Sequence, residues 1–154
     1  MLNVHNTTTK SWILLGVALA VTVLFMVFAE PVFTMLYLGT DEFADAMYDF
    51  NLYFSLASFI CIVVWVFAIL YYWIIDSVSL SAFGWWALFG VLAIAVSPIL
   101  VYCYSLNVFD AENMAFDSDV IGMAVVTIPI ALVLYLIVSI GIKDMSTNCS
   151  TRPY

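Results

Sequence analysis

The sequence predicts an all-α integral membrane protein, a four-helix transmembrane bundle with up-down-up-down connectivity and short loops. The first observation is composition, since 66% of the 154 residues are hydrophobic and 9% are charged. Soluble domains have about 45–50% apolar and about 25% charged residues. The second observation is the placement of charge, because four long runs contain no Asp, Glu, Lys or Arg: residues 11–29, 50–75, 77–109 and 120–142.

Each of these runs is long enough to cross a membrane as a helix. The hydrocarbon core is about 30 Å thick and a helix rises about 1.5 Å per residue, so about 20 residues are needed. A helix also satisfies its backbone polar groups within the segment, as hydrocarbon requires. We predict spans near residues 11–34, 50–75, 82–106 and 119–142, within one membrane domain covering residues 1–154. A cleaved signal peptide over residues 1–29 is disfavoured, because the apolar stretch exceeds the usual length of about 7–15 residues.

Basic residues predict the orientation. The three present, Lys10, Lys143 and Arg152, lie before the first span and after the last. Lys and Arg are enriched on the cytoplasmic side, so both termini are expected in the cytoplasm, with the protein in a plasma or inner membrane. The first and third loops then lie outside and hold most of the carboxylates: Asp41, Glu42, Asp45, Asp49, Asp110, Glu112, Asp117 and Asp119.

These two acidic loops are the first candidate site. Short hairpins would bring them together as a rim that concentrates cations, holds calcium through carboxylate oxygens, or contacts a partner. The alternative, which we favour, is that they are solvated loops that also supply helix N-caps. In that interpretation Asp117, Ser118 or Asp119 caps the last helix, and Asp49 or Asn51 caps the second.

Glu30 is the second candidate, because the apolar pattern resumes after it and Pro31. A carboxylate at membrane depth is costly and suggests an ion pathway or a partner contact. The favoured alternative is that the first helix ends near Glu30, with the carboxylate in water.

Prolines and small residues predict details of packing. Pro98 and Pro129 lie inside the third and fourth spans, where kinks are expected, and the hydroxyls of Ser97 and Thr127 could satisfy freed carbonyls. Small residues four apart allow helices to approach closely. We expect the two such pairs, Gly16 with Ala20 and Ala93 with Ser97, to pack inside the bundle.

Several classes of function are disfavoured by composition. A net charge of −8 argues against nucleic acid as a partner, since phosphates need clustered Lys and Arg. The single histidine, His5, precedes the first span, so we expect no haem or other cofactor, no metal site and no catalytic set. Cys61, Cys103 and Cys149 form no disulfide framework.

The remaining prediction is a non-catalytic accessory or assembly subunit of a larger membrane complex, which could itself be an enzyme. Its partners would be the lipid bilayer and other integral membrane proteins or copies of itself. Two alternatives stay open: a small oligomeric cation channel or transporter that uses the acidic rim and Glu30, and a membrane immunity protein that blocks a toxin.

Overall fold

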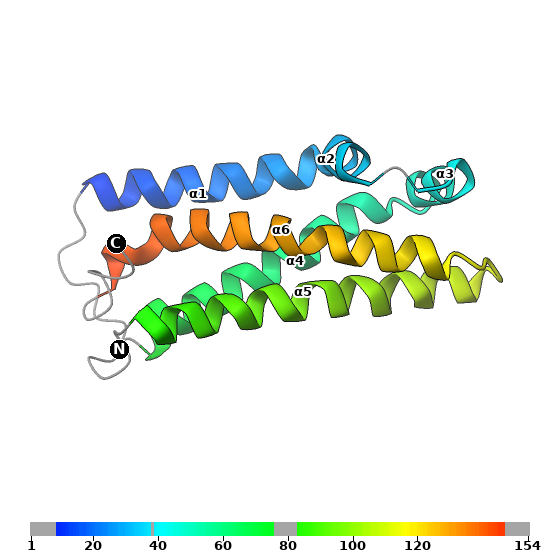
Figure 1. Cartoon of the computed structure of the whole chain (residues 1–154). Coiled ribbons are helices and arrows are strands. Elements are labelled where there is room, and N and C mark those ends of the chain that lie inside the picture. Colours follow the sequence, from blue (N-terminus) through cyan, green and yellow to red (C-terminus); the bar gives the residue numbers. More distant parts are fainter. Residues whose placement is uncertain (1–8, 38, 76–82, 147–154) are drawn as a thin grey trace.

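A computed structural model describes residues 9–37, 39–75 and 83–146 and confirms the predicted bundle (Figure 1). Four long segments are apolar enough to cross a membrane, so the chain is an integral membrane protein. They are α1 (Thr9–Val27), α4 (Leu52–Ile69) with its π-helical continuation η1 (Leu70–Ile75), α5 (Phe83–Ala111), and α6 (Asp117–Ile142) with the 3-10 turn η3 (Lys143–Met145). The predictions that concern His5, Cys149 and Arg152 lie outside the described residues.

The first predicted span is wrong at its C-terminal limit, because α1 ends at Val27 instead of continuing to residue 34. Phe28 leaves helical geometry, with φ −99° and ψ 26°, and a separate helix α2 (Ala29–Leu36) follows. Pro31 explains the position of this break, since it has no N–H to donate to the carbonyl of Val27 and its ring crowds that carbonyl. Within α2, Pro31 lies in the first turn, where an N–H has no intrahelical partner.

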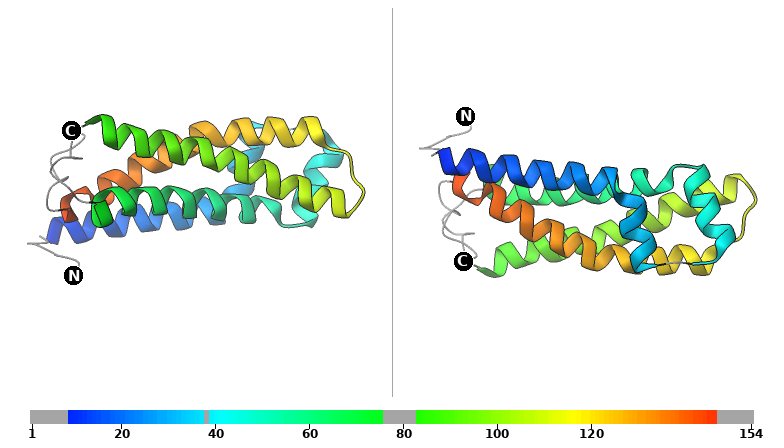
Figure 2. Two further views of the ribbon diagram at one scale, coloured as in Figure 1. Left: turned by 90° about the horizontal axis from the view of Figure 1, so that it is seen from below. Right: turned by 90° about the horizontal axis from the view of Figure 1, so that it is seen from above.

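The first connection, predicted as a loop, contains two helices. Figure 2 shows α2 running across the end of the bundle from α1 toward the start of α6, and α3 (Asp41–Asp49) returning toward α4. Thr40 begins α3 as its N-cap, with its hydroxyl accepting a hydrogen bond from the backbone N–H of Phe43 at 3.3 Å. The N-cap satisfies one of the free N–H groups of the first turn.

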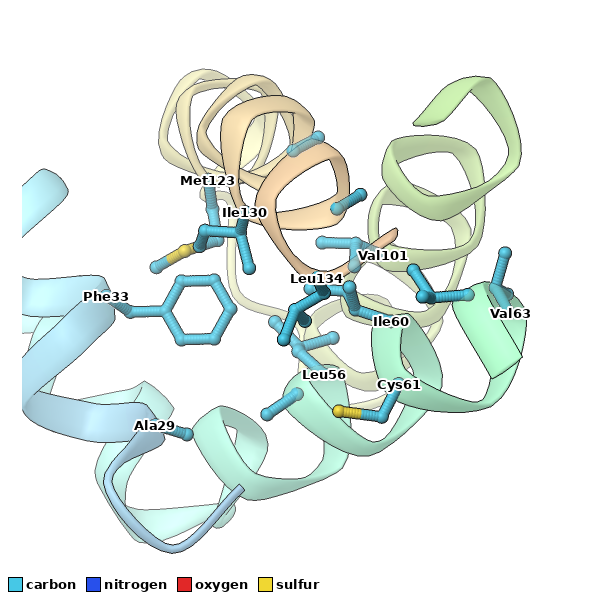
Figure 3. Close-up of a cluster of buried hydrophobic side chains, with 14 of the residues drawn as sticks. Ala29, Phe33, Leu56, Ile60, Cys61, Val63, Val101, Met123, Ile130 and Leu134 are labelled. Carbon is cyan, nitrogen blue, oxygen red and sulfur yellow. The ribbon is translucent and has the colours of Figure 1, made fainter. Parts of the chain in front are cut away.

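Phe33 anchors α2 to the bundle. Its side chain is fully buried, and Figure 3 shows the ring pointing from α2 between Leu56 of α4 and Met123 and Ile130 of α6. The ring also lies 6.2 Å from that of Phe25 in α1, measured between centroids. Burying a Phe side chain is worth about 1.5–3 kcal/mol, which is enough to hold a helix of two turns against the bundle end.

The central helix is α6, which packs against α1, α4 and α5. Two close approaches fix its C-terminal half. A Cβ on Gly141 would lie 2.5 Å from the Cβ of Ala18 in α1, so only glycine allows that crossing. Earlier in α6, the ring of Tyr135 lies on Gly90 of α5, and the Tyr135 hydroxyl donates to the backbone carbonyl of Trp86 at 3.0 Å.

One of the two pairs of small residues is buried and the other is exposed. Ala93 and Ser97 are buried inside the bundle, as predicted. Gly16 and Ala20 are exposed, and Gly16 has no atom within 4 Å of an added Cβ, so the prediction that this pair packs the bundle is wrong. The buried face of α1 is formed instead by Ser11, Ala18 and Thr22.

Both interior prolines lie within continuous helices. Ser97 donates to the carbonyl of Ala93 at 2.8 Å, and Thr127 donates to that of Ala124 at 2.6 Å. The hydroxyls therefore bind the carbonyls next to the ones that Pro98 and Pro129 leave without an N–H, and not the freed carbonyls as predicted.

The third span is longer than predicted, while the second and fourth agree within two residues. α5 continues past residue 106 to Ala111, and its 29 residues span about 43 Å. This length exceeds what an upright helix needs to cross a hydrocarbon core of about 30 Å. The C-terminal end of α5 carries Phe109, which is buried beneath α3 and the α5–α6 connection.

Candidate functional site at the acidic end

We call the end formed by α2, α3 and the α5–α6 connection the acidic end, and the opposite end the basic end. The two described cations, Lys10 at the start of α1 and Lys143 just after α6, both lie at the basic end (Figure 1). The described part of the chain thus offers no Lys, Arg or His to neutralise the carboxylates of the acidic end.

α3 is amphipathic and gives the acidic end its surface. Phe43, Ala46 and Met47 are buried on one side of the helix. The opposite side exposes four carboxylates: Asp41, Asp45 and Asp49, which are spaced by about one helical turn, and Glu42 beside Asp41. Asp41 and Glu42 lie in the first turn, where negative charge interacts favourably with the helix dipole.

An aromatic cluster lies beneath α3 and continues the hydrophobic core of the bundle. The ring of Phe43 is 5.7 Å from Phe109 and 5.6 Å from Phe116, and these two rings are 5.1 Å apart. Phe50 joins from the end of α3, at 6.4 Å from Phe109. Edge-on contacts of this kind add to the burial of each ring, so the cluster fixes α3 and the α5–α6 connection to each other.

A groove of about 510 Å³ runs between α3 and that connection. One wall carries Glu42, Asp45 and Asp49, and the other is apolar, with Met114, Ala115 and Phe116. Among the residues that the structure describes, no group of three carboxylate, His or Cys side chains has the spacing of a metal site. The groove therefore combines negative charge with apolar surface and does not form a closed ligand set.

Asp119 differs from the other predicted carboxylates because it is buried, with 9% of its surface exposed. The Tyr37 hydroxyl donates to its Oδ1 at 2.9 Å, and the Thr40 hydroxyl donates to its Oδ2 at 3.2 Å. The Tyr37 ring lies directly on Gly122, where an added Cβ would collide with Cζ of the ring. These three side chains connect the α2–α3 turn to the first turn of α6, and we call them the Tyr37–Thr40–Asp119 cluster.

The pKa of the Tyr37 hydroxyl is raised in the folded protein, in part by the carboxylate of Asp119. Partial burial, the hydrogen bond to Asp119 and the negative charge of that carboxylate all raise the pKa of the Tyr37 hydroxyl above 10.0. Tyr37 is therefore neutral at physiological pH and able to donate its proton to Asp119.

Glu30 lies apart from the other carboxylates. It is exposed and lines a second groove, of about 540 Å³, beside the break between α1 and α2. The far wall of this groove is formed by Tyr48 at the end of α3 and by Asn51, Tyr53 and Phe54 at the start of α4. The structure thus places Glu30 next to tyrosine and amide side chains, in a different groove from the carboxylates of α3.

The remaining predicted site residues are exposed around the α5–α6 connection. Asp110 lies in the last turn of α5, Glu112 in the turn that follows, and Asp117 in the first turn of α6. The capping prediction is wrong for α6, whose N-cap is Phe116 without a side-chain hydrogen bond. Asn51 does occupy the N-cap of α4, but it is left-handed (φ 51°) and its side chain makes no capping bond.

Comparison of the chain with models of known protein families, with curated proteins and with solved structures finds no match.

Sequence reasoning missed Tyr37, Thr40 and Tyr53. A signal for α3 was present, since Thr40 precedes two acidic residues and the apolar positions Phe43, Ala46 and Met47 have helical spacing. The pairing of Tyr37 with Asp119 had no comparable signal, because the two residues are 82 positions apart.

Proposed function

We propose that this protein is a non-catalytic accessory or assembly subunit that packs α1 against another integral membrane protein. The observation that carries the proposal is the exposure of α1. Within the most apolar part of each span, 17% of the α1 residues are buried, compared with 28% for Phe83–Ala111, 44% for Asp117–Met145 and 50% for Leu52–Ile75.

The exposed face of α1 has the composition of a helix-pairing surface. Gly16 and Ala20 lie one turn apart, and the apolar residues around them on the same face, Ile13, Val17 and Leu24, are also exposed. Between helices in lipid, small residues let two backbones approach closely and increase van der Waals contact. A face that contacts lipid alone would tolerate a larger side chain as well as any other exposed face of the bundle.

Charge favours a different chain over a second copy as the partner. The protein has a net charge of −8, and its described cations are all at the basic end. Two copies paired side by side through α1 in parallel would bring two acidic ends together, and like charges repel. A partner with basic residues at that level would avoid this cost.

Purification of the tagged full chain in mild detergent tests the proposal. We expect a second membrane protein at fixed stoichiometry, and we expect Ala20→Leu to release it without lowering the melting temperature. Ala95→Leu is the matched control, because Ala95 is an exposed alanine on α5. A single monodisperse species, or equal effects of the two variants, would contradict the proposal.

We also propose that the basic end faces the cytoplasm and the acidic end the outside of a plasma or inner membrane. The support is the position of Lys10 and Lys143 at one end, which follows the positive-inside tendency. In a background without native cysteines, Asn113→Cys should react with an impermeant maleimide on intact cells, and Lys10→Cys only after permeabilisation. The reverse pattern would overturn this orientation.

A further inference from the structure

The groove beside Glu30 contains polar groups that the described part of the protein leaves without partners. Tyr53 is 6% exposed and lines the groove, yet its hydroxyl makes no hydrogen bond to any described residue. The hydroxyl oxygen is not enclosed by protein atoms, so it can donate to an atom that occupies the groove. A ligand atom in the groove would provide that partner.

Glu30 is the charged group of this groove, and no cation among the described residues is close to it. Lys10 and Lys143 are both at the opposite end of the bundle. Glu30 and Tyr53 line the same groove, so a ligand there would meet both the carboxylate and the phenol. A positively charged group next to Glu30 would neutralise it, and the aromatic rings of Tyr48 and Tyr53 provide faces that attract cations.

The location of the groove limits the kind of ligand. Its lower wall consists of membrane-spanning residues, Met26 and Val27 of α1 and Phe54 of α4. Its upper wall consists of residues outside the spans, Glu30 and Asn51. A ligand that fits both walls has a polar, positively charged head and an apolar body, and it reaches the groove from the bilayer.

We infer that this groove binds the headgroup of a zwitterionic phospholipid, with its ammonium group against Glu30. The ammonium would donate to the carboxylate of Glu30, and a hydrogen bond between two charged groups is stronger than one between neutral groups. The phosphate would accept hydrogen bonds from the Asn51 amide and the Tyr53 hydroxyl. An anionic lipid fits poorly, because the groove contains a carboxylate and no Lys or Arg. The inference does not depend on a protein partner for α1.

Native mass spectrometry of the full chain in detergent tests the inference. The protein is titrated with phosphatidylethanolamine, phosphatidylcholine or phosphatidylglycerol of identical acyl chains, and separately with free ethanolamine. We expect phosphatidylethanolamine to bind about tenfold more tightly than phosphatidylglycerol, and Glu30→Gln to remove about tenfold in affinity. Tyr53→Phe keeps the ring contact with Phe33 and should cost about fivefold.

The matched control is Glu42→Gln, which removes a carboxylate from α3 that lines the other groove. It should leave lipid affinity unchanged. Phosphatidylcholine that binds as well as phosphatidylethanolamine would also support the inference, with the phenol faces holding the ammonium. Equal binding of phosphatidylglycerol, equal effects of Glu30→Gln and Glu42→Gln, or free ethanolamine binding as tightly as the lipid would each overturn it.

Discussion

The two ends of the bundle are held by similar contacts with different chemistry. At the basic end Tyr135 lies on Gly90 and donates to the backbone carbonyl of Trp86, and at the acidic end Tyr37 lies on Gly122 and donates to Asp119. The acceptor is neutral at the basic end and a buried carboxylate at the acidic end. Packing therefore holds both ends, and the acidic end depends in addition on two hydroxyl donors to one buried charge.

The largest loss of stability is expected from crowding the α1–α6 crossing at the basic end. Gly141→Leu would place a side chain where Ala18 and the carbonyl of Leu14 already lie, at 2.5 and 3.2 Å from the first added atom. Overpacking of this kind costs about 3 kcal/mol, because backbone must move. Thermal unfolding in a fixed detergent should show a large loss for Gly141→Leu and little change for Gly84→Leu, where an added Cβ meets no atom within 4 Å. Equal melting temperatures would refute the close α1–α6 crossing.

Removing each tyrosine hydroxyl compares the two ends directly. Tyr37→Phe should cost about 2 kcal/mol, because a hydrogen bond to a charged group is lost and Asp119 keeps Thr40 as its one described donor. Tyr135→Phe should cost about 1 kcal/mol, because its acceptor is a neutral carbonyl. The melting temperatures of the two variants measure the difference, and a larger loss for Tyr135→Phe would reverse our interpretation.

Thr40 tests whether one hydroxyl serves both α3 and Asp119. Thr40→Ala removes the N-cap of α3, at a cost of about 1 kcal/mol, and also removes a donor to Asp119. Thr40→Ser keeps the hydroxyl and should be close to the natural protein in melting temperature. If serine and alanine are equally destabilising, the methyl group and not the hydroxyl matters at this position.

The smallest change in stability is expected from alkaline pH, which removes the proton of the Tyr37 hydroxyl. The pKa of Tyr37 is raised in the folded protein, so its contribution to stability is fully present below about pH 10 and is lost as pH rises through that raised pKa. The difference in melting temperature between the natural protein and Tyr37→Phe should be constant from pH 7 to pH 9 and should narrow above about pH 10. A difference that widens there would mean that the tyrosinate is the favoured form.

The spans followed from the sequence because each depends on local composition. A run of about 20 apolar residues without charge has one stable conformation in a bilayer, whatever its neighbours are. The limit of residue 34 for the first span was wrong, because the resumed apolar pattern belongs to α2, whereas the favoured interpretation that the first helix ends near Glu30 agrees with α1 ending at Val27. The same local reasoning also failed at Ala111, since the extension of α5 serves the contact of Phe109 with Phe43 and Phe116.

The residue types in the sequence located the candidate sites, but the sequence did not show which of those residues come together in space. The carboxylates identified the two acidic connections between spans, because charge is excluded from the hydrocarbon, but they did not show that the first connection contains α3. Asp119 was grouped with exposed neighbours, although its burial depends on Tyr37 and Thr40 from a distant segment. The groove beside Glu30 required the break after Val27, which turns α2 across the bundle end and leaves Glu30 facing Tyr53.

Composition and charge placement by themselves determined that this protein is a bundle of four membrane-spanning helices with one acidic end, because exclusion of charge from hydrocarbon acts on each segment separately. Tertiary structure decided which faces of those helices meet. The crossing of α1 and α6 places Gly141 in the interior and leaves Gly16 on the surface. Close packing depends on the shapes of both helices, so the sequence of one helix does not determine it. The same holds for Asp119, whose burial is stable because two distant hydroxyls donate to it.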